Sequence, residues 1–239
     1  MQGTIRLFKF AGIQVYLHFT WFIIAAYEFT QRINVYERPI WSALEYLALF
    51  GIVLLHEFGH ALACRQTGGT ADQIVLWPLG GIAFVDPPRR PGAVLWSIAA
   101  GPLVNVVLFP IFLILLLLIR GGDMAEQNPD LVRFVSMVAY INGSLLVFNL
   151  LPVYPLDGGQ ILRALLWFPL GEIRSLQIAS VIGLIGSVAL AGLFLMLGIG
   201  IFWTAILAFF LFSRAIAGWQ YANAMLAEKK AAEVPPPIP

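Results

Sequence analysis

The sequence predicts an all-α polytopic membrane protein with about six transmembrane helices and one short membrane-associated β-hairpin. Two observations lead to this fold class. Of the 239 residues, 60% are hydrophobic and 11% are charged, whereas soluble domains are nearer half apolar and a quarter charged. The apolar residues also form long blocks, which is the pattern of transmembrane helices. No polar block is long enough to enclose its own core, so we expect a single membrane-embedded domain over residues 1–227.

Six apolar blocks are candidates for membrane spans. The first is short and imperfect, whereas the others are long enough to cross a bilayer as helices. The predicted spans are 16–27, 40–64, 93–119, 131–151, 176–197 and 201–219. Residues 1–12 are interpreted as a cytosolic leader, because they lack the small-residue cleavage site of a removable signal. The proline-rich tail, residues 228–239, is predicted to be disordered in the cytosol.

The segment 71–85 lies between the second and third spans and is too short and too glycine-broken to cross the membrane. Its two β-prone pieces flank Pro78, Gly80 and Gly81, which is typical of a hairpin. Such backbone is tolerated at membrane depth only where it is buried in protein or lines a wet cavity. We therefore expect a hairpin that dips into the inner leaflet.

The distribution of Lys and Arg predicts the orientation of the spans. With a cytosolic N-terminus, ten of the 14 Lys and Arg residues fall on the cytosolic side. The four on the outer side are Arg32, Arg38, Arg120 and Arg133. This bias predicts a multi-pass protein of the cell membrane with both termini in the cytosol. It follows that the second and fourth spans run in the same direction and end near the cytosolic face.

The remaining composition says little about partners. The net charge is +1 and no Lys/Arg cluster is present, so we expect no nucleic-acid partner. The single cysteine, Cys64, excludes an internal disulfide. The lipid bilayer is the one partner that the composition itself implies.

Residues 56–60 read His-Glu-Phe-Gly-His and lie inside the second span. Positions i and i+4 share a helix face, so His56 and His60 can bind one metal ion. Glu57 lies about 100° around the helix from His56, where its carboxylate can take a proton from a water that zinc activates. The alternative is a purely structural polar cluster. However, two of only three histidines fall at this spacing, and ionisable residues inside a membrane are costly and usually functional.

A catalytic zinc usually has three protein ligands and an open position, so a third ligand is expected. Asp157 is the favoured candidate, because the topology places the ends of the second and fourth spans at similar depth. Cys64, at i+4 from His60, is the alternative. A helix cannot easily wrap three successive turns around one ion, so a packing role is favoured for this thiol. His18 is interpreted as a packing or gating residue and not as a ligand.

These motifs resemble those of the site-2 proteases, a family of intramembrane zinc metalloproteases. The resemblance covers most of the chain, and its segments are 56–60, the hairpin glycines Gly80 and Gly81, Ala-Gly-Pro-Leu-Val-Asn at 100–105, and residues 149–159. It implies one Zn²⁺ per chain, bound by His56, His60 and Asp157, with Glu57 as the general base. The added soluble domains of larger relatives are not seen in this sequence, so it resembles a minimal catalytic core.

The resemblance also implies that Asn149 and Pro152 help to hold the substrate and that Asn105 lies near the active site, with a substrate-binding role. Judged by the residues alone, Asn105 can equally hydrogen-bond across helices, and Pro152 can simply end the fourth helix. The pair Gly158 and Gly159 is expected to permit an unusual backbone turn after Asp157.

The combined prediction is a zinc-dependent intramembrane endopeptidase that acts in regulated intramembrane proteolysis, with its active site toward the cytosolic side. Asn149 and Asn105 are candidates to stabilise the oxyanion. A strand edge within residues 74–84 is the candidate for holding an extended substrate. The family implies substrates such as single-span membrane proteins or signal peptides, and a regulatory membrane partner.

Two other classes of function stay open at this point. The first is a membrane zinc transporter, although transport does not require Glu57 inside the motif, and the sequence shows no repeated halves. The second is an inactive membrane scaffold that binds partner helices, which the intact set of chemical residues disfavours.

Overall fold

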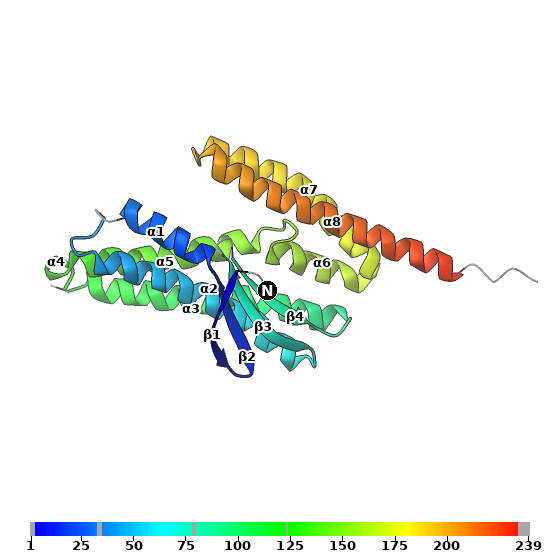
Figure 1. Cartoon of the computed structure of the whole chain (residues 1–239), viewed down its shortest axis with the longest axis horizontal. Coiled ribbons are helices and arrows are strands. Elements are labelled where there is room, and N and C mark those ends of the chain that lie inside the picture. The colour runs from blue at the N-terminus through cyan, green and yellow to red at the C-terminus, as the bar shows by residue number, and fades with distance from the viewer. Residues whose placement is uncertain (1–2, 33–34, 78–79, 123, 234–239) are drawn as a thin grey trace, which may run out of the picture. The chain divides into compact units, whose positions relative to one another are not determined.

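The computed structural model describes residues 3–32, 35–77, 80–122 and 124–233, and the chain forms two compact units (Figure 1). The first unit comprises Met1–Arg89 and Trp96–Phe148, and the second comprises Arg90–Leu95 and Asn149–Pro239. The helices are α1 (Thr20–Arg32), α2 (Ile40–Gln66), α3 (Pro91–Arg120), α4 (Met124–Gln127), α5 (Pro129–Leu150), α6 (Asp157–Leu170), α7 (Glu172–Met196) and α8 (Ile201–Glu233).

Within the described residues, five helices are long and apolar enough to span a bilayer, namely α2, α3, α5, α7 and α8. They coincide, within a few residues at most ends, with the last five predicted spans. The prediction of a helix over 16–27 is wrong, because residues up to His18 belong to strand β2 (Ile13–His18) and α1 has 13 residues. A helix of that length is about 20 Å long, which is shorter than the hydrocarbon core of about 30 Å.

Four strands form one sheet in the order β1 (Thr4–Phe10), β2, β3 (Thr70–Trp77) and β4 (Gly80–Asp86), and they lie side by side in Figure 1. The pairs β1–β2 and β3–β4 are antiparallel, and the central pair β2–β3 is parallel. Strands β3 and β4 occupy the residues of the predicted hairpin. Its turn, residues 78–79, lies outside the described residues, and its place in the inner leaflet stays a prediction.

The first two strands differ from the predicted cytosolic leader and first span. Strand β1 is an edge strand whose side chains are almost all exposed, so burial imposes no clear apolar–polar alternation on its sequence. Strand β2 lies between β1 and β3 and is buried on both faces. Its sequence, Ile-Gln-Val-Tyr-Leu-His, alternates apolar and polar residues as strands do, but it runs directly into the apolar block of α1, so the predicted span 16–27 took in its second half.

The sheet packs on α2 through one hydrophobic core. The fully buried residues Ile13, Ile74 and Leu76 of the sheet share this core with Phe58 and Ala61 of α2. Of the most apolar stretch of α2, 50% of the residues are buried, whereas the buried share is 17% in α3 and 22% in α5. The helix that carries the predicted metal ligands is therefore the most enclosed long helix of the first unit.

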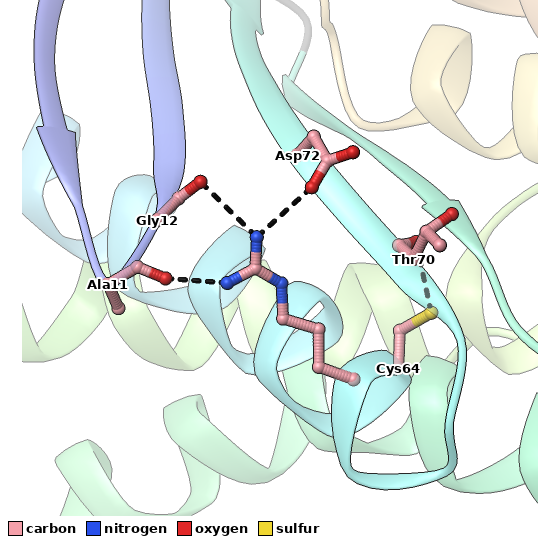
Figure 2. A network of polar contacts seen from close by, with 6 residues as sticks. Ala11, Gly12, Cys64, Thr70 and Asp72 are labelled. Atoms are coloured by element: carbon pink, nitrogen blue, oxygen red, sulfur yellow. Dashed lines mark hydrogen bonds and ion pairs between the residues drawn. The ribbon is translucent and has the colours of Figure 1, made fainter.

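Polar contacts hold other elements at both ends of α2: the β1–β2 turn at its C-terminal end and the start of α5 at its N-terminal end. The guanidinium of Arg65, near the C-terminal end of α2, donates to the carbonyls of Ala11 and Gly12 in the β1–β2 turn and pairs with Asp72 at 3.2 Å (Figure 2). At the other end, Asp130 of α5 accepts backbone N–H bonds from residues 37 and 38, just before α2. The chain therefore passes from the C-terminal end of α2 to its N-terminal end through strand β2 and the short helix α1.

Helices α2 and α5 run in the same direction, and α3 runs opposite to them. Trp41 and Phe134, near the starts of α2 and α5, have ring centroids 5.3 Å apart. Along α3 the contact partners on α2 come in reverse order, because Ser97 lies beside His60 whereas Asn105 lies beside His56. This matches the predicted direction of the second and fourth spans.

The second unit consists of α6, α7 and α8, with α6 packed against α7 and α7 packed along α8. A side-chain hydrogen bond of 2.8 Å from Gln177 to Asn223 joins α7 and α8. Helix α8 continues to Glu233, so residues 228–233 are helical where the sequence predicts a disordered tail. Their composition explains the difference, because Ala, Glu and Lys are strong helix formers. Residues 234–239 lie outside the described residues.

Candidate metal centre

His56 and His60 lie on one face of α2 and point their ring nitrogens at each other. Their Nε2 atoms are 3.0 Å apart, and each residue is only 6% exposed. Two nitrogen ligands of a tetrahedral zinc, each about 2.1 Å from the ion, would lie about 3.4 Å apart. The pair is therefore within a few tenths of an ångström of the spacing that one zinc ion needs.

The opposite nitrogen of each ring has a polar partner. The Nδ1 atom of His60 lies 2.9 Å from the backbone carbonyl of Ser97, and that of His56 lies 2.6 Å from Oδ1 of Asn105. Both partners are oxygens that accept, so both Nδ1 atoms donate, and a neutral ring then carries its lone pair on Nε2. Two lone pairs aimed at each other at 3.0 Å repel unless a cation lies between them. This donor set fits a zinc ion.

The partner of His56 belongs to a buried amide pair. Asn105 of α3 and Asn142 of α5 are both fully buried. Asn105 Nδ2 donates to Asn142 Oδ1 at 2.8 Å, and Asn142 Nδ2 donates to the backbone carbonyl of Asn105 at 2.9 Å. Both ends of the Asn105 side-chain amide are thus engaged by protein atoms. The alternative left open by the sequence, a hydrogen bond across helices, is present together with a contact to the candidate metal ligand.

His60 rests against α3 where that helix has no side chain. A Cβ atom placed on Gly101 would overlap the His60 ring, so only glycine leaves room for the imidazole there. On α2, directly before His60, a Cβ on Gly59 would lie 2.6 Å from the carbonyl oxygen of Ala100. These two glycines let α2 and α3 approach closely, which is how small residues act in membrane helix pairs.

Glu57 points toward strand β4. Its carboxylate accepts the backbone N–H of Ala83 at 2.9 Å, and its side chain is buried. A Cβ on Gly81 would overlap the Glu57 side chain, so this glycine of the hairpin gives the carboxylate its space. Since β4 is the last strand of the sheet, the Ala83 N–H that Glu57 accepts lies on the edge that has no neighbouring strand.

Asp157 is the first residue of α6, in the second unit, and is half-buried. Asn149 lies one residue before the end of α5, and the exposed Pro152 follows that end. Gly158 and Gly159 have helical backbone, so the expected unusual turn is absent at these two residues. They are needed for space instead, because a Cβ on either would overlap the backbone of residues 150–154.

The two remaining candidate residues have packing environments. His18 is buried, its ring stacks on Trp77 at 3.9 Å between centroids, and its Nδ1 lies 2.7 Å from the hydroxyl of Thr20. Cys64 is buried in the core between sheet and α2, and its thiol donates to the carbonyl of Thr70 at 3.4 Å (Figure 2). Both environments agree with the packing roles that the sequence favours.

Sequence reasoning missed three groups at this centre: the carbonyl of Ser97, the amide of Asn142 and the N–H of Ala83. The two backbone groups have no sequence signature, because every residue type offers the same carbonyl and nearly every one the same N–H. Asn142 could have been found, since a polar amide inside an apolar span calls for a partner in a neighbouring helix.

Comparisons with known proteins identify the family of this chain. A sequence model described as Peptidase family M50 matches residues 45–128 and 117–193. Zinc metalloprotease MJ0392 of Methanocaldococcus jannaschii is 34% identical over 77% of this chain and 51% of its own length. The Synechocystis protein sll0528 is 31% identical over 96% of this chain and 62% of its own length. The chain thus spans about half to three fifths of these curated relatives.

A solved structure also resembles this chain over nearly its full length. The site-2 protease from Methanocaldococcus jannaschii has a TM-score of 0.61 and 30% sequence identity, with 90% of this chain and 95% of that chain covered. Together with the five apolar helices within the described residues, this makes the chain a multi-pass membrane protein whose family cofactor is zinc. The chain belongs to peptidase family M50, the site-2 protease family of membrane zinc metallopeptidases.

Proposed function

We propose that this chain is a zinc-dependent endopeptidase that cleaves membrane-spanning substrates within or beside the bilayer. The observation that carries the proposal is the pair of histidines on the apolar helix α2. The Nε2 atoms of His56 and His60 are 3.0 Å apart, and Glu57, which can act as a base, lies between them in the sequence. When bound, zinc supplies Lewis acidity for the scissile carbonyl and for the attacking water.

Glu57 is the general base of the proposed reaction. Its carboxylate lies one residue from His56 and is buried, so it can accept a proton from water beside the metal without being a ligand. It then returns this proton to the leaving amine. The Ala83 N–H holds the carboxylate toward the sheet edge, which is the side on which an extended substrate would lie.

Asp157 is the proposed third ligand, and the open fourth position would then face the substrate. Its support is chemical and sequence-based: a carboxylate is a common zinc ligand, and Asp157 lies within residues 117–193 of the family match. Asn149 and Pro152 are the proposed substrate-holding residues. Asn105 is better suited to support His56, because its side-chain amide is engaged by His56 and Asn142.

Strand β4 is the proposed docking edge for the substrate. A helical substrate hides its peptide bonds in its own hydrogen bonds and has to become extended before attack, and an unpaired strand edge can hold it in that form. The Ala83→Pro substitution removes the edge N–H that Glu57 accepts, while the ladder to β3 uses the other side of the strand. We expect slower cleavage with zinc retained, because the carboxylate loses its support at this edge, and Ala83→Ser, which keeps the N–H, is a matched control. Normal cleavage by Ala83→Pro would contradict a role of this edge N–H in the reaction.

We place both termini and the active site on the cytosolic side of the cell membrane. The Lys and Arg bias supports this orientation, and so does the contact of the β1–β2 turn with Arg65, which puts the N-terminal strands at the C-terminal end of α2. Single-span membrane proteins and signal peptides are the proposed substrates, in regulated intramembrane proteolysis with a regulatory membrane partner. Labelling of single cysteines introduced at residues 12 and 122 would test the orientation.

The function is tested by comparing the wild type with Glu57→Gln in zinc content and in cleavage of single-span substrates. We expect equal zinc in both and a loss of cleavage of about 10²- to 10⁴-fold in the variant, since that is the usual contribution of a general base. Equal cleavage would rule out the proposed mechanism. Zinc uptake into vesicles by both proteins would favour a transporter, and zinc binding without cleavage or uptake would favour a scaffold.

The third ligand is tested by Asp157→Ala, with zinc occupancy as the measurement. Loss of one of three protein ligands should lower occupancy sharply at a fixed free zinc concentration. The substitution Asp72→Ala, of an exposed carboxylate that pairs with Arg65, is the control and should leave occupancy unchanged. Unchanged occupancy in Asp157→Ala would remove Asp157 as a ligand.

A further inference from the structure

Asn142 lies at the end of a chain of hydrogen bonds that reaches one of the two histidines, His56. It is fully buried on α5, and its amide makes two hydrogen bonds to Asn105, one to the side chain and one to the backbone. Asn105 Oδ1 in turn lies 2.6 Å from Nδ1 of His56.

A carboxamide has an acceptor end and a donor end of nearly the same shape, so a buried amide can turn over unless its partners prevent it. If the Asn105 amide turned over, its NH₂ group would face Nδ1 of His56. Nδ1 would then have to accept, and the ring proton would move to Nε2. A protonated Nε2 cannot bind a metal.

The backbone carbonyl of Asn105 prevents this reversal. A carbonyl oxygen can only accept, so it fixes the NH₂ end of Asn142 on its side, 2.9 Å away. The Oδ1 of Asn142 then faces Asn105 and requires a donor there, which fixes Nδ2 of Asn105 at 2.8 Å. Oδ1 of Asn105 is thereby left for His56. The direction of every bond in the series is set by one backbone atom.

We propose that Asn142 is a positioning residue for the metal centre: it fixes the orientation of the Asn105 amide and, through it, the tautomer of His56 that presents Nε2 to zinc. This inference rests on the proposed function, because it takes His56 as a zinc ligand. Groups that hold a metal-binding histidine through its other nitrogen typically affect metal affinity about 10- to 100-fold. Asn142 acts one residue further away, so the lower end of that range applies.

Asparagine pairs also join helices in membranes, and a joining role has to be separated from a positioning role. The first measurement is the zinc affinity of the purified full chain, by competition with a chelating indicator, for wild type and Asn142→Leu. We expect affinity to fall on the order of tenfold. Ser144→Leu makes the same kind of change at an exposed position of α5 and should leave affinity unchanged.

The decisive measurement repeats the substitution in an Asn105→Asp background. A carboxylate has two acceptor oxygens and no donor end, so it accepts from His56 in either orientation and needs nothing to fix it. We therefore expect Asn142→Leu to have no effect, or a small gain, in that background. An equal tenfold loss in both backgrounds would show that Asn142 only joins the helices, and the inference would fail.

Two further variants keep the outcomes distinct. His56→Ala must abolish tight zinc binding; if it does not, the proposed metal site and this inference both fail. If zinc binding depends on His56 but Asn142→Leu leaves it unchanged in the native background, the inference alone fails. Should Asn142→Leu not yield folded protein, Asn142→Ala is compared in the same two backgrounds, with the same expected difference between them.

Discussion

The two histidines of the motif look equivalent in the sequence, but the structure holds them in different ways. His60 donates to a backbone carbonyl, that of Ser97, whereas His56 donates to a side-chain oxygen of Asn105. A backbone carbonyl is present whatever residue occupies the position and cannot turn over. A side-chain amide can be lost by mutation and can be reversed, so it needs a support of its own, and Asn142 provides it.

The two histidines are therefore held in two different ways inside the apolar helix bundle. At His60 the requirement is steric, since the ring needs the empty space at Gly101 to reach the backbone of α3. At His56 the requirement is polar, since two buried amides have to satisfy each other inside an apolar helix bundle. The two histidines should therefore respond to different kinds of substitution.

The largest effect is expected from Gly101→Ala. The new Cβ would overlap the His60 ring, so the ring or the helix has to move, and the pair of Nε2 atoms separates. We expect zinc binding to be lost or to weaken by more than about 100-fold, beyond the range of polar supports. Gly92→Ala in the same helix is the control, since a Cβ there meets nothing within 4 Å. Near-normal zinc affinity in Gly101→Ala would contradict the steric requirement at His60.

An intermediate effect is expected from Asn105→Leu. This change removes the acceptor of His56 and the side-chain donor to Asn142 Oδ1, while the backbone carbonyl of residue 105 still accepts from Asn142. We expect zinc affinity to fall by about 10- to 100-fold, because the ring is no longer fixed in one tautomer. The measurement is the same competition for zinc, and Asn105→Asp, which keeps an acceptor, should retain most of the affinity. A loss of zinc affinity in Asn105→Asp as large as in Asn105→Leu would contradict the requirement for a polar acceptor at His56.

The smallest effect is expected from Ser97→Ala. Although Ser97 supports His60, it does so with its backbone carbonyl, which alanine also has. Its hydroxyl makes a long contact of 3.4 Å to the His60 carbonyl and a side-chain hydrogen bond with Cys64. We expect zinc affinity within about twofold of wild type and at most about 1 kcal/mol of lost stability. A loss as large as that of Asn105→Leu would show that both histidines depend on side chains.

Much of the centre follows from the sequence. The spacing of His56 and His60, with Glu57 between them, depends only on the helical period, which is a local property of the chain. The long apolar blocks likewise predict α2, α3, α5, α7 and α8, because a membrane requires every spanning segment to satisfy its own backbone. The paired strands over 71–85 were also readable, from glycine and β-prone residues.

The rest needed the tertiary structure. Strand β1 was missed because it is exposed on both faces, and strand β2 because its short alternation of apolar and polar residues runs directly into the apolar block of α1. The choice of a backbone carbonyl for His60 and of an amide pair for His56 depends on how closely α3 and α5 approach α2. That approach is set by glycine contacts and side-chain packing between residues far apart in the chain.

The sequence by itself therefore determined the chemical groups of this protein: two histidines on one helix face, a glutamate between them and apolar spans around them, all encoded by residues close together or by composition. Only the tertiary structure decided how that chemistry is held in place. Hydrogen-bond direction, the space at Gly101 and the edge of β4 beside Glu57 are relations between separate segments, and no local pattern in the sequence records them.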